Sequence, residues 1–124
     1  MNIGEISKQF DISCDTLRYY EKIGLIGPIM KNTSGIRDYK QEDIKQLEFV
    51  KCMRNANISI EALLRYLTLY KQGDSTIEER KTILISELQK VNNEIKKLKQ
   101  AKEKLEYKIN LYDQQLLEMG LKSE

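Results

Sequence analysis

The sequence predicts a mainly α-helical protein in which a head of short helices is followed by one long helix. Three observations support this class. Apolar residues in the N-terminal part recur every three or four positions, as on one face of a helix. Turn-forming glycine, proline and asparagine gather between positions 24 and 35. Beyond position 77 the apolar residues recur twice in every seven, which is the pattern of a coiled coil.

Two short helices are expected at positions 3–10 and 14–23, joined by a turn at 11–13. Ser13 is a suitable N-cap for the second helix, because its hydroxyl can accept a hydrogen bond from a free backbone N–H. Gly24 is a suitable C-terminal stop. Short helices joined by a turn of about three residues are typical of a helix-turn-helix. The apolar face of the first helix consists of Ile3, Ile6 and Phe10.

Residues 25–39 are not expected to be helical. Gly27-Pro28 interrupts helical backbone, and Asn32-Thr33-Ser34-Gly35 is a turn signal. Apolar residues lie on both sides of this turn, with Ile29-Met30 before it and Ile36 after it. The segment is therefore predicted to form a small hairpin, or wing.

Two further helices are predicted at about 41–56 and 59–73, with Ser59 as N-cap and Gly73 as stop of the latter. The former is apolar on two opposite sides, so we expect one side to pack in the head and the other against the next helix or the partner's coil. Cys52 would then lie at the contact between the head and the dimerising helix. The two apolar stripes are Ile44, Leu47 and Val50, and Phe49, Cys52 and Ala56.

A single long helix is predicted from a capping box at 75–78 to about Leu117. Its seam positions alternate by four and three, and only Lys81 and Lys102 among them are not apolar. A helix of roughly 60 Å carries an apolar stripe that the small head cannot bury, so we expect a homodimer. Heptads alone do not decide between parallel and antiparallel pairing. The predicted dimerisation residues are Leu84, Leu88, Val91, Ile95, Leu98, Leu105, Ile109 and Tyr112.

Composition argues against several classes of protein. The chain has 124 residues, a net charge of only +2 and no histidine, so it lacks the commonest general base and metal ligand. The sequence has no glycine-rich loop of the kind that binds phosphate, and no nucleophile with a suitably spaced base. We therefore do not expect an enzyme. No signal peptide and no membrane-length apolar run is found. We expect no catalytic residue, metal or cofactor, and a cytoplasmic protein whose thiols, Cys14 and Cys52, stay reduced.

Basic and aromatic side chains gather on one side of the second helix, where arginine could bind guanine edges or phosphate and lysine and tyrosine could hold backbone oxygens. At about 100° per residue the outward side consists of Asp15, Arg18, Tyr19 and Lys22, with Thr16 at its margin. Leu17 and Tyr20 face the first helix. The wing adds Lys31, Arg37 and Tyr39. The pattern alone is equally compatible with the solvated face of a small helical domain.

The segment Thr16-Leu17-Arg18-Tyr19-Tyr20-Glu21-Lys22-Ile23-Gly24-Leu25-Ile26 closely resembles the signature of MerR-family regulators. In the wing, Gly35-Ile36-Arg37-Asp38-Tyr39, followed by Asp43-Ile44, resembles the same family. The resemblance spans residues 1 to about 70, and a long helix follows in the expected place. Because the motif is long and fixed in position, it is highly specific.

The resemblance implies a winged helix-turn-helix head and an antiparallel coiled-coil dimer. It also implies a transcription regulator that binds double-stranded promoter DNA in an overlong spacer. Such regulators bend and untwist the spacer when the effector is sensed, which would realign the promoter elements for RNA polymerase and so activate transcription indirectly. The expected domains are the head at 1–73, the coiled coil at 74–118 and a short tail at 119–124. By motif position, the DNA-contacting residues are Thr16, Arg18, Tyr19, Tyr20, Lys22, Arg37 and Tyr39.

Cysteine usage bears on what such a regulator senses. Metal- and cluster-sensing relatives carry cysteines near the end of the coil, but none follows Cys52 here, so these effectors are not expected. Nor do we expect the large effector domain of drug-sensing relatives, because the sequence ends at Glu124. Residues 49–56 resemble the aldehyde-responsive, AdhR-like branch of the family. This implies that Cys52 senses electrophiles, since a thiolate adds to a carbonyl carbon.

The sequence leaves alternatives open. Cys52 has no cation among its helical neighbours and could be a structural thiol, the role expected for Cys14. The protein could respond to a non-covalent ligand at the junction of head and coil. It could also be a coiled-coil adaptor with no role in DNA binding.

Overall fold

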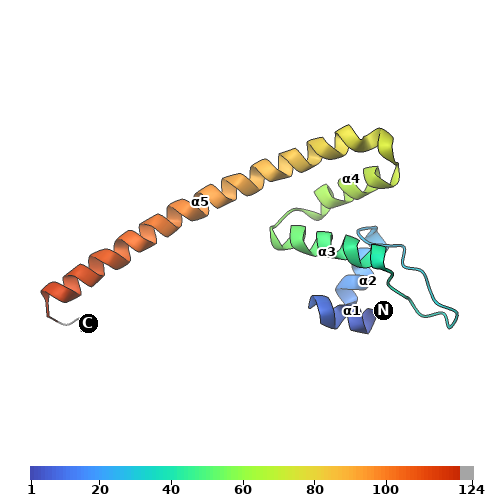
Figure 1. The fold of residues 1–124 in the computed structure, drawn as a ribbon, viewed down its shortest axis with the longest axis horizontal. Coiled ribbons are helices and arrows are strands. Elements are labelled where there is room, and N and C mark those ends of the chain that lie inside the picture. Colours follow the sequence, from blue (N-terminus) through green and yellow to red (C-terminus); the bar gives the residue numbers. More distant parts are fainter. Residues whose placement is uncertain (121–124) are drawn as a thin grey trace. The chain divides into compact units, whose positions relative to one another are not determined.

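The computed structural model describes residues 1–120 (Figure 1). The helices in this part of the chain are α1 (Ile3–Phe10), α2 (Cys14–Ile23), α3 (Gln41–Asn55), α4 (Ile60–Lys71), the 3-10 turn η1 (Asp74–Thr76) and α5 (Ile77–Glu118). The chain divides into two compact units, Met1–Leu84 and the residues from Ile85 onward. None of these helices combines the length and the apolar character that a membrane span requires. Of the expected tail, residues 121–124 lie outside the described part.

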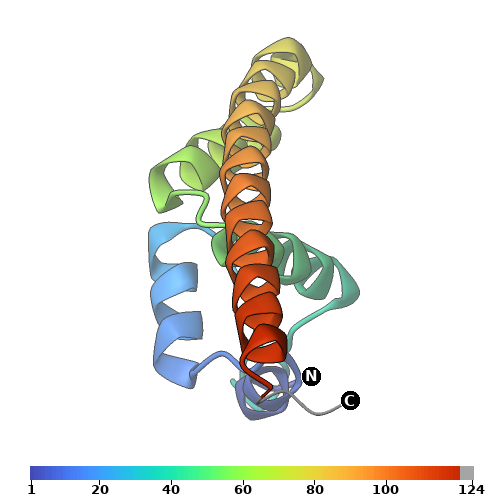
Figure 2. The same cartoon turned by 90° about the vertical axis from the view of Figure 1, so that its left-hand side faces the viewer.

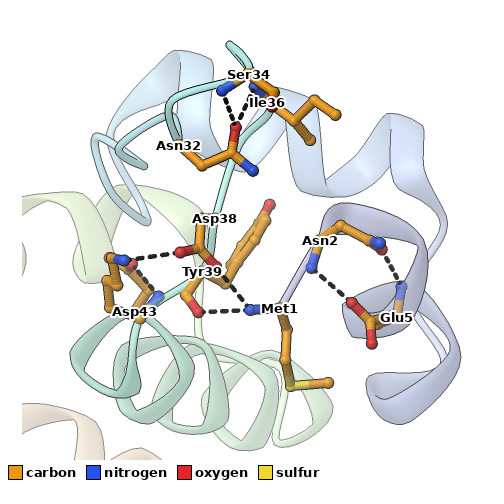
Figure 3. Close-up of polar contacts among 10 residues, drawn as sticks. Met1, Asn2, Glu5, Asn32, Ser34, Ile36, Asp38, Tyr39 and Asp43 are labelled. Carbon is orange, nitrogen blue, oxygen red and sulfur yellow. Dashed lines mark hydrogen bonds and ion pairs between the residues drawn. The ribbon is translucent and has the colours of Figure 1, made fainter.

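α1 and α2 form the predicted helix-turn-helix, and Figure 2 shows α2 along its length with α1 seen nearly end-on below it. A capping box starts α1: the Asn2 side chain accepts the Glu5 N–H, and the Glu5 carboxylate accepts the Asn2 N–H (Figure 3). Asp11, with φ of 52°, ends α1. Ser13 then caps α2, since its hydroxyl oxygen accepts the Thr16 N–H at 3.1 Å, as the sequence predicts.

The end of α2 is tied to α3. Gly24 has φ of 89°, and the N–H groups of Leu25 and Ile26 donate to the Tyr20 carbonyl oxygen at 2.9 and 3.4 Å. This is the Schellman-type ending that a C-terminal glycine favours. The Gln46 side chain on α3 donates to the Leu25 carbonyl oxygen at 2.9 Å. The orientation of α2 is therefore set by α3 as well as by α1.

The core of the first unit joins α1, α2, the segment after α2, and α3. Burying an aliphatic side chain of this size contributes about 1.5–3 kcal/mol to folding. α4 adds the buried side chains of Ala62, Leu63 and Leu67. The side chains that are almost completely inaccessible are Ile6, Leu17, Leu25, Ile26, Leu47 and Val50.

The predicted wing is present as a minimal hairpin. Residues 1–120 contain no strand, but Lys31 and Arg37 form an antiparallel bridge. Backbone hydrogen bonds flank it: the Asn32 N–H donates to the Ile36 carbonyl oxygen at 2.7 Å, and the Asp38 N–H donates to the Met30 carbonyl oxygen at 2.8 Å. The Asn32 side-chain oxygen closes the turn by accepting the N–H groups of Ser34 at 2.9 Å and Ile36 at 3.1 Å (Figure 3).

The start of α5 also differs from prediction, because η1 takes the place of the capping box expected at 75–78. Thr76 is buried, and its hydroxyl lies 2.6 Å from the Leu69 carbonyl oxygen and 2.8 Å from that of Gly73. The Arg80 Nε donates to the Thr76 hydroxyl oxygen at 3.0 Å. These contacts fasten the first turn of α5 to the end of α4.

α5 is one continuous helix of 42 residues, as the heptads predict. The first compact unit extends to Leu84, whereas the expected head ends at residue 73. Along the helix the predicted seam is uncovered: its large apolar side chains are exposed by between 40% (Leu84) and 68% (Leu98). Val91 is half-buried. Exposing such an apolar stripe to water is unfavourable, and a stripe of this length is typical of an interface.

Candidate nucleic-acid interface and sensor cysteine

α2 presents its side chains as the helical geometry predicts. Leu17 is fully buried, and Arg18, Tyr19 and Lys22 are exposed on the opposite side. Tyr20 is half-buried. The exposed side is thus a cationic and aromatic surface on the second helix of a helix-turn-helix, the element that enters the major groove in such proteins.

Arg18 is paired within its own helix. Its Nη1 lies 3.1 Å from the Asp15 Oδ1, and the Asp15 side chain is 96% exposed. Exposed pairs of this kind contribute about 0–1 kcal/mol. Arg18 can therefore exchange Asp15 for a phosphate or a guanine edge at little cost. Thr16, at the margin of this face, is half-buried and accepts a hydrogen bond from the Ser13 hydroxyl at 2.9 Å.

The wing is connected to α2 through Glu21, which is not among the site residues predicted from the sequence. The Arg37 Nε donates to Glu21 Oε1 at 2.7 Å, and the Ile29 N–H donates to Glu21 Oε2 at 3.3 Å. The Glu21 side chain is only 17% exposed, against 42% for Arg37. The only signal in the sequence was an acidic residue within an otherwise basic stretch of the recognition helix.

Tyr39, which the motif position predicts as a DNA contact, is buried in the free chain, with 2% of the residue exposed. Its backbone is held to Met1, with the Tyr39 N–H donating to the Met1 carbonyl oxygen at 2.7 Å. The hydroxyl has no hydrogen-bond partner among the described residues. Burial raises the pKa of Tyr39, and the Glu21 carboxylate raises it further. In this conformation Tyr39 is a core residue, and its contact with DNA stays a prediction.

The base of the wing is held by charge (Figure 3). The N-terminal ammonium of Met1 lies 2.8 Å from the Asp38 Oδ1, and the Lys40 Nζ lies 2.7 Å from the Asp38 Oδ2. Hydrogen bonds from Lys40 and from the ammonium lower the pKa of Asp38 to about 2. In return, Asp38 raises the pKa of Lys40. The Lys40 N–H donates to the Asp43 carboxylate at 2.8 Å, which caps α3.

Cys52 is exposed on α3 of the single chain, so its predicted place between the head and the partner's coil stays a prediction. Of its apolar stripe only Phe49 is half-buried, with its ring 5.6 Å from that of Tyr66 on α4. Ala56 is exposed like the thiol. The first stripe on α3 behaves as expected, with Leu47 fully buried. A buried structural thiol is therefore not what the chain by itself presents.

The two cations nearest to Cys52 in sequence are engaged elsewhere, as predicted. The Lys51 Nζ donates to the Phe10 carbonyl oxygen and lies 5.9 Å from the centre of the Phe10 ring. The Arg54 Nη1 donates to the Ile58 carbonyl oxygen at 2.9 Å. The described residues contain no group of three or more histidine, cysteine or acidic residues placed to hold a metal.

An aromatic hollow of about 700 Å³ opens between the start of the wing, α3 and α4. Its walls include Phe49, Tyr66 and Tyr70, with Glu42 and Lys71 at the polar side. Concave, mostly apolar sites with a few polar groups are where small ligands bind. Cys52 is not among the residues that line it.

Taken together, a helix-turn-helix with a cationic second helix and an adjacent basic wing defines a DNA-binding head. The family model described as "MerR HTH family regulatory protein" matches residues 1–69, and that described as "MerR, DNA binding" matches residues 44–107. The chain belongs to the MerR family of helix-turn-helix regulators. The resemblance seen in the sequence is thereby confirmed.

The chain is 57% identical to the HTH-type transcriptional regulator AdhR of Bacillus subtilis over 91 residues, which are 73% of this chain and 65% of AdhR. The match thus spans slightly less than two thirds of AdhR, and it supports the AdhR-like branch. A crystal structure of a MerR family transcriptional regulator from Listeria monocytogenes has a TM-score of 0.90 and 41% identity, covering 97% of this chain and 91% of that one.

A second solved structure is that of HiNmlR, a MerR family regulator lacking the sensor domain, bound to promoter DNA. It has a TM-score of 0.82 and 29% identity, and covers 96% of this chain and 94% of that one. Each of these relatives is a transcription regulator by name, in agreement with the expectation that the chain is not an enzyme.

Proposed function

We propose that the protein is a transcription regulator that binds the spacer of a promoter as a homodimer. The observation that carries this proposal is the exposed side of α2, where Arg18, Tyr19 and Lys22 lie together, with Arg37 of the wing tied to the same helix. The similarity to HiNmlR, which was crystallised on promoter DNA, supports it.

The residues divide into base-reading and phosphate-holding groups. Arg18 has the geometry to chelate a guanine edge or a phosphate, and Tyr19 and Lys22 can hold backbone oxygens. Thr16 and Tyr20, both half-buried, line the margin of this surface. Arg37 contacts the phosphates beside the major groove. Tyr39 acts from inside the head and supports the wing.

The uncovered seam of α5 supports a second copy of the chain as partner. The proposed pairing is antiparallel, through the seam residues of the coil at 74–118. A dimer holds two identical heads at a fixed spacing, and a two-fold operator matches that spacing. Distortion of the spacer between the half-sites then changes the alignment of the promoter elements, which RNA polymerase reads.

We further propose that Cys52 senses aldehydes or related electrophiles, as its exposure and the similarity to AdhR suggest. The thiolate sulfur forms a bond to the carbonyl carbon while the carbonyl π bond breaks. The oxygen takes up a proton, and the product is a hemithioacetal. The polar adduct would shift the packing of the head on the coil of the dimer and so change the distortion of DNA.

The DNA-binding proposal is tested by titrating a labelled promoter duplex with the protein. Specific binding should exceed binding to a scrambled duplex by about a thousandfold or more. Equal affinity for both duplexes, or no binding to either, would contradict the proposal and favour a coiled-coil adaptor with no role in DNA binding.

The sensor proposal is tested by protection from alkylation. Prior exposure to an aldehyde should slow the reaction of Cys52 with iodoacetamide, as read by peptide mass spectrometry. In a promoter reporter, Cys52→Ala should bind the operator but lose induction by aldehydes. Cys14→Ala, which removes the half-buried thiol, is the matched control and should respond normally.

The aromatic hollow favours a second candidate, in which a non-covalent ligand is the effector. In this candidate the protein is the same dimeric regulator, but the ligand would bind in the hollow, against Phe49, Tyr66 and Tyr70. Normal aldehyde induction in Cys52→Ala, combined with loss of induction in Tyr66→Ala, would favour this candidate over the thiol.

A further inference from the structure

We propose that Glu21 is a positioning residue for DNA binding: it fastens the wing to α2 and orients Arg37 toward the phosphates. One of its tests, the measurement of promoter affinity, rests on the proposed function. It adds a residue that carries the wrong charge for DNA and that touches no DNA itself.

The geometry places Glu21 at the centre of the wing's attachment. One carboxylate oxygen accepts the Arg37 Nε at 2.7 Å, and the other accepts the Ile29 N–H at 3.3 Å. Ile29 precedes the wing turn and Arg37 follows it. A single side chain on the recognition helix therefore holds both arms of the wing.

The wing needs such an attachment because it has little internal structure. Its arms are joined by one bridge, between Lys31 and Arg37, and by a few hydrogen bonds beside it, with no longer strand ladder to fix their direction. Charge-assisted hydrogen bonds are stronger than neutral ones, and the pair is partly shielded, with Glu21 17% exposed. Without it, the wing would sample a wider range of angles relative to α2, and binding DNA would require ordering it again.

The contact with Glu21 also leaves the two Nη atoms of Arg37 available for a phosphate. Only its Nε is engaged by Glu21, and no hydrogen bond to its two Nη atoms is found among residues 1–120. A guanidinium presents a planar fork of donors that matches a phosphate. The hydrogen bond from the Arg37 Nε to Glu21 therefore orients the guanidinium, while both Nη atoms remain available to a phosphate.

The sign of the effect separates this proposal from simple electrostatics. A carboxylate on a DNA-facing helix repels phosphates, so charge alone predicts that Glu21→Gln tightens binding. Positioning predicts the reverse. Glutamine has the same shape, but its amide nitrogen cannot accept a hydrogen bond, so only one of the two wing contacts survives.

The test is a titration of promoter duplex by wild type and Glu21→Gln at several salt concentrations. We expect about tenfold weaker binding and a salt slope reduced by about one unit, because the phosphate contact of Arg37 is lost. Asp15→Asn is the matched control. It removes a carboxylate from the same helix that pairs with Arg18 but not with the wing, so it should bind at least as tightly as wild type.

A double-mutant cycle tests whether Glu21 affects DNA binding through Arg37. Glu21→Gln combined with Arg37→Gln should bind no more weakly than Arg37→Gln alone. Additive losses, or wild-type affinity and salt slope in Glu21→Gln, would overturn the proposal while leaving promoter binding intact. If wild type itself does not bind the promoter, the proposed function fails.

Hydrogen exchange of the free protein tests the positioning without DNA. The Ile29 amide and the wing amides up to Arg37 should exchange faster in Glu21→Gln, while the amides of α2 and α3 keep their protection. Unchanged exchange at Ile29 would refute the attachment whatever the DNA result. Loss of protection throughout the head would refute it equally, because it would indicate a general structural role.

Discussion

At the scale of single residues, the position of a charge matters more than the total charge of the chain. The net charge is only +2, yet Arg18 and Lys22 are exposed side by side on α2. The electrostatic term in DNA binding comes from such local groups, because each one neutralises a phosphate and releases a counterion. The acidic partners of these cations are therefore as informative as the cations.

Arg18→Ala should weaken promoter binding by about 1–3 kcal/mol, since a bidentate contact to a base or phosphate is lost. The change is on an exposed side chain, so thermal unfolding should be almost unaffected. Gel-shift titration measures the first effect and calorimetry the second. Lys97→Ala, which removes a cation paired with Glu94 on α5, is the control and should keep its affinity. Unchanged binding by Arg18→Ala would contradict the assignment of α2 as the recognition helix.

Asp38 provides a test of the charges that hold the wing. Its pKa in the folded protein is lowered from 3.8 to about 2 by Lys40 and the N-terminal ammonium. Because the folded value is the lower one, the stabilisation is present above about pH 4 and is lost as the pH falls toward 2. The thermal midpoints of wild type and Asp38→Asn should therefore differ near neutral pH and converge over this range. A constant difference would show that Asp38 acts through something other than its charge.

At the scale of elements, the turn between α2 and the wing is sterically restricted. Gly27 has φ of 76°, and a Cβ built on it would lie 2.6 Å from the Ile29 backbone nitrogen. That nitrogen is the donor to Glu21. The backbone conformation and the anchoring of the wing thus depend on the same position.

Gly27→Ala should lower the free energy of unfolding by about 1–3 kcal/mol, from the strained φ and the close contact together. Gly35→Ala in the wing turn is a suitable control, because its φ is 77° but nothing lies within 4 Å of its Cβ. It should show only the cost of the backbone conformation, about 1 kcal/mol. Equal losses from both substitutions, measured by urea unfolding, would mean that the contact with Ile29 is relieved at no cost.

At the scale of the whole molecule, the main feature is the exposed apolar stripe of α5, on which the proposed dimer depends. Leu98, at a central seam position, is 68% exposed, and similar side chains recur along the helix. Single exposed apolar residues are common, but a continuous stripe marks an interface. The proposed dimer is what would give the two heads a defined spacing.

Leu98→Glu should convert the dimer to a monomer, because burying an unpaired carboxylate in the seam costs several kcal/mol. The head should remain folded, and promoter affinity should fall. Sedimentation analysis measures the mass directly. Gln100→Glu adds the same charge two positions away, outside the seam, and should remain dimeric. A wild-type protein that sediments as a monomer would remove the dimer from the proposed function.

Local spacing and one contiguous motif were enough to predict the five α-helices, the caps at Ser13, Gly24 and Ser59, and the family. They did not predict the start of α5, where η1 takes the place of the expected capping box. The order of α1 to α5, Ser13 as N-cap and Leu17 as a core residue all follow from residues within a few positions of one another. The burial of Tyr39 and the exposure of Cys52 became visible only in the folded chain. The tertiary structure also decided that Glu21 holds Arg37, sixteen positions away. The physical reason is that such contacts depend on the path of the chain between the two residues, here a loop shaped by Asn32 and Gly27, and no periodicity in the sequence records that path.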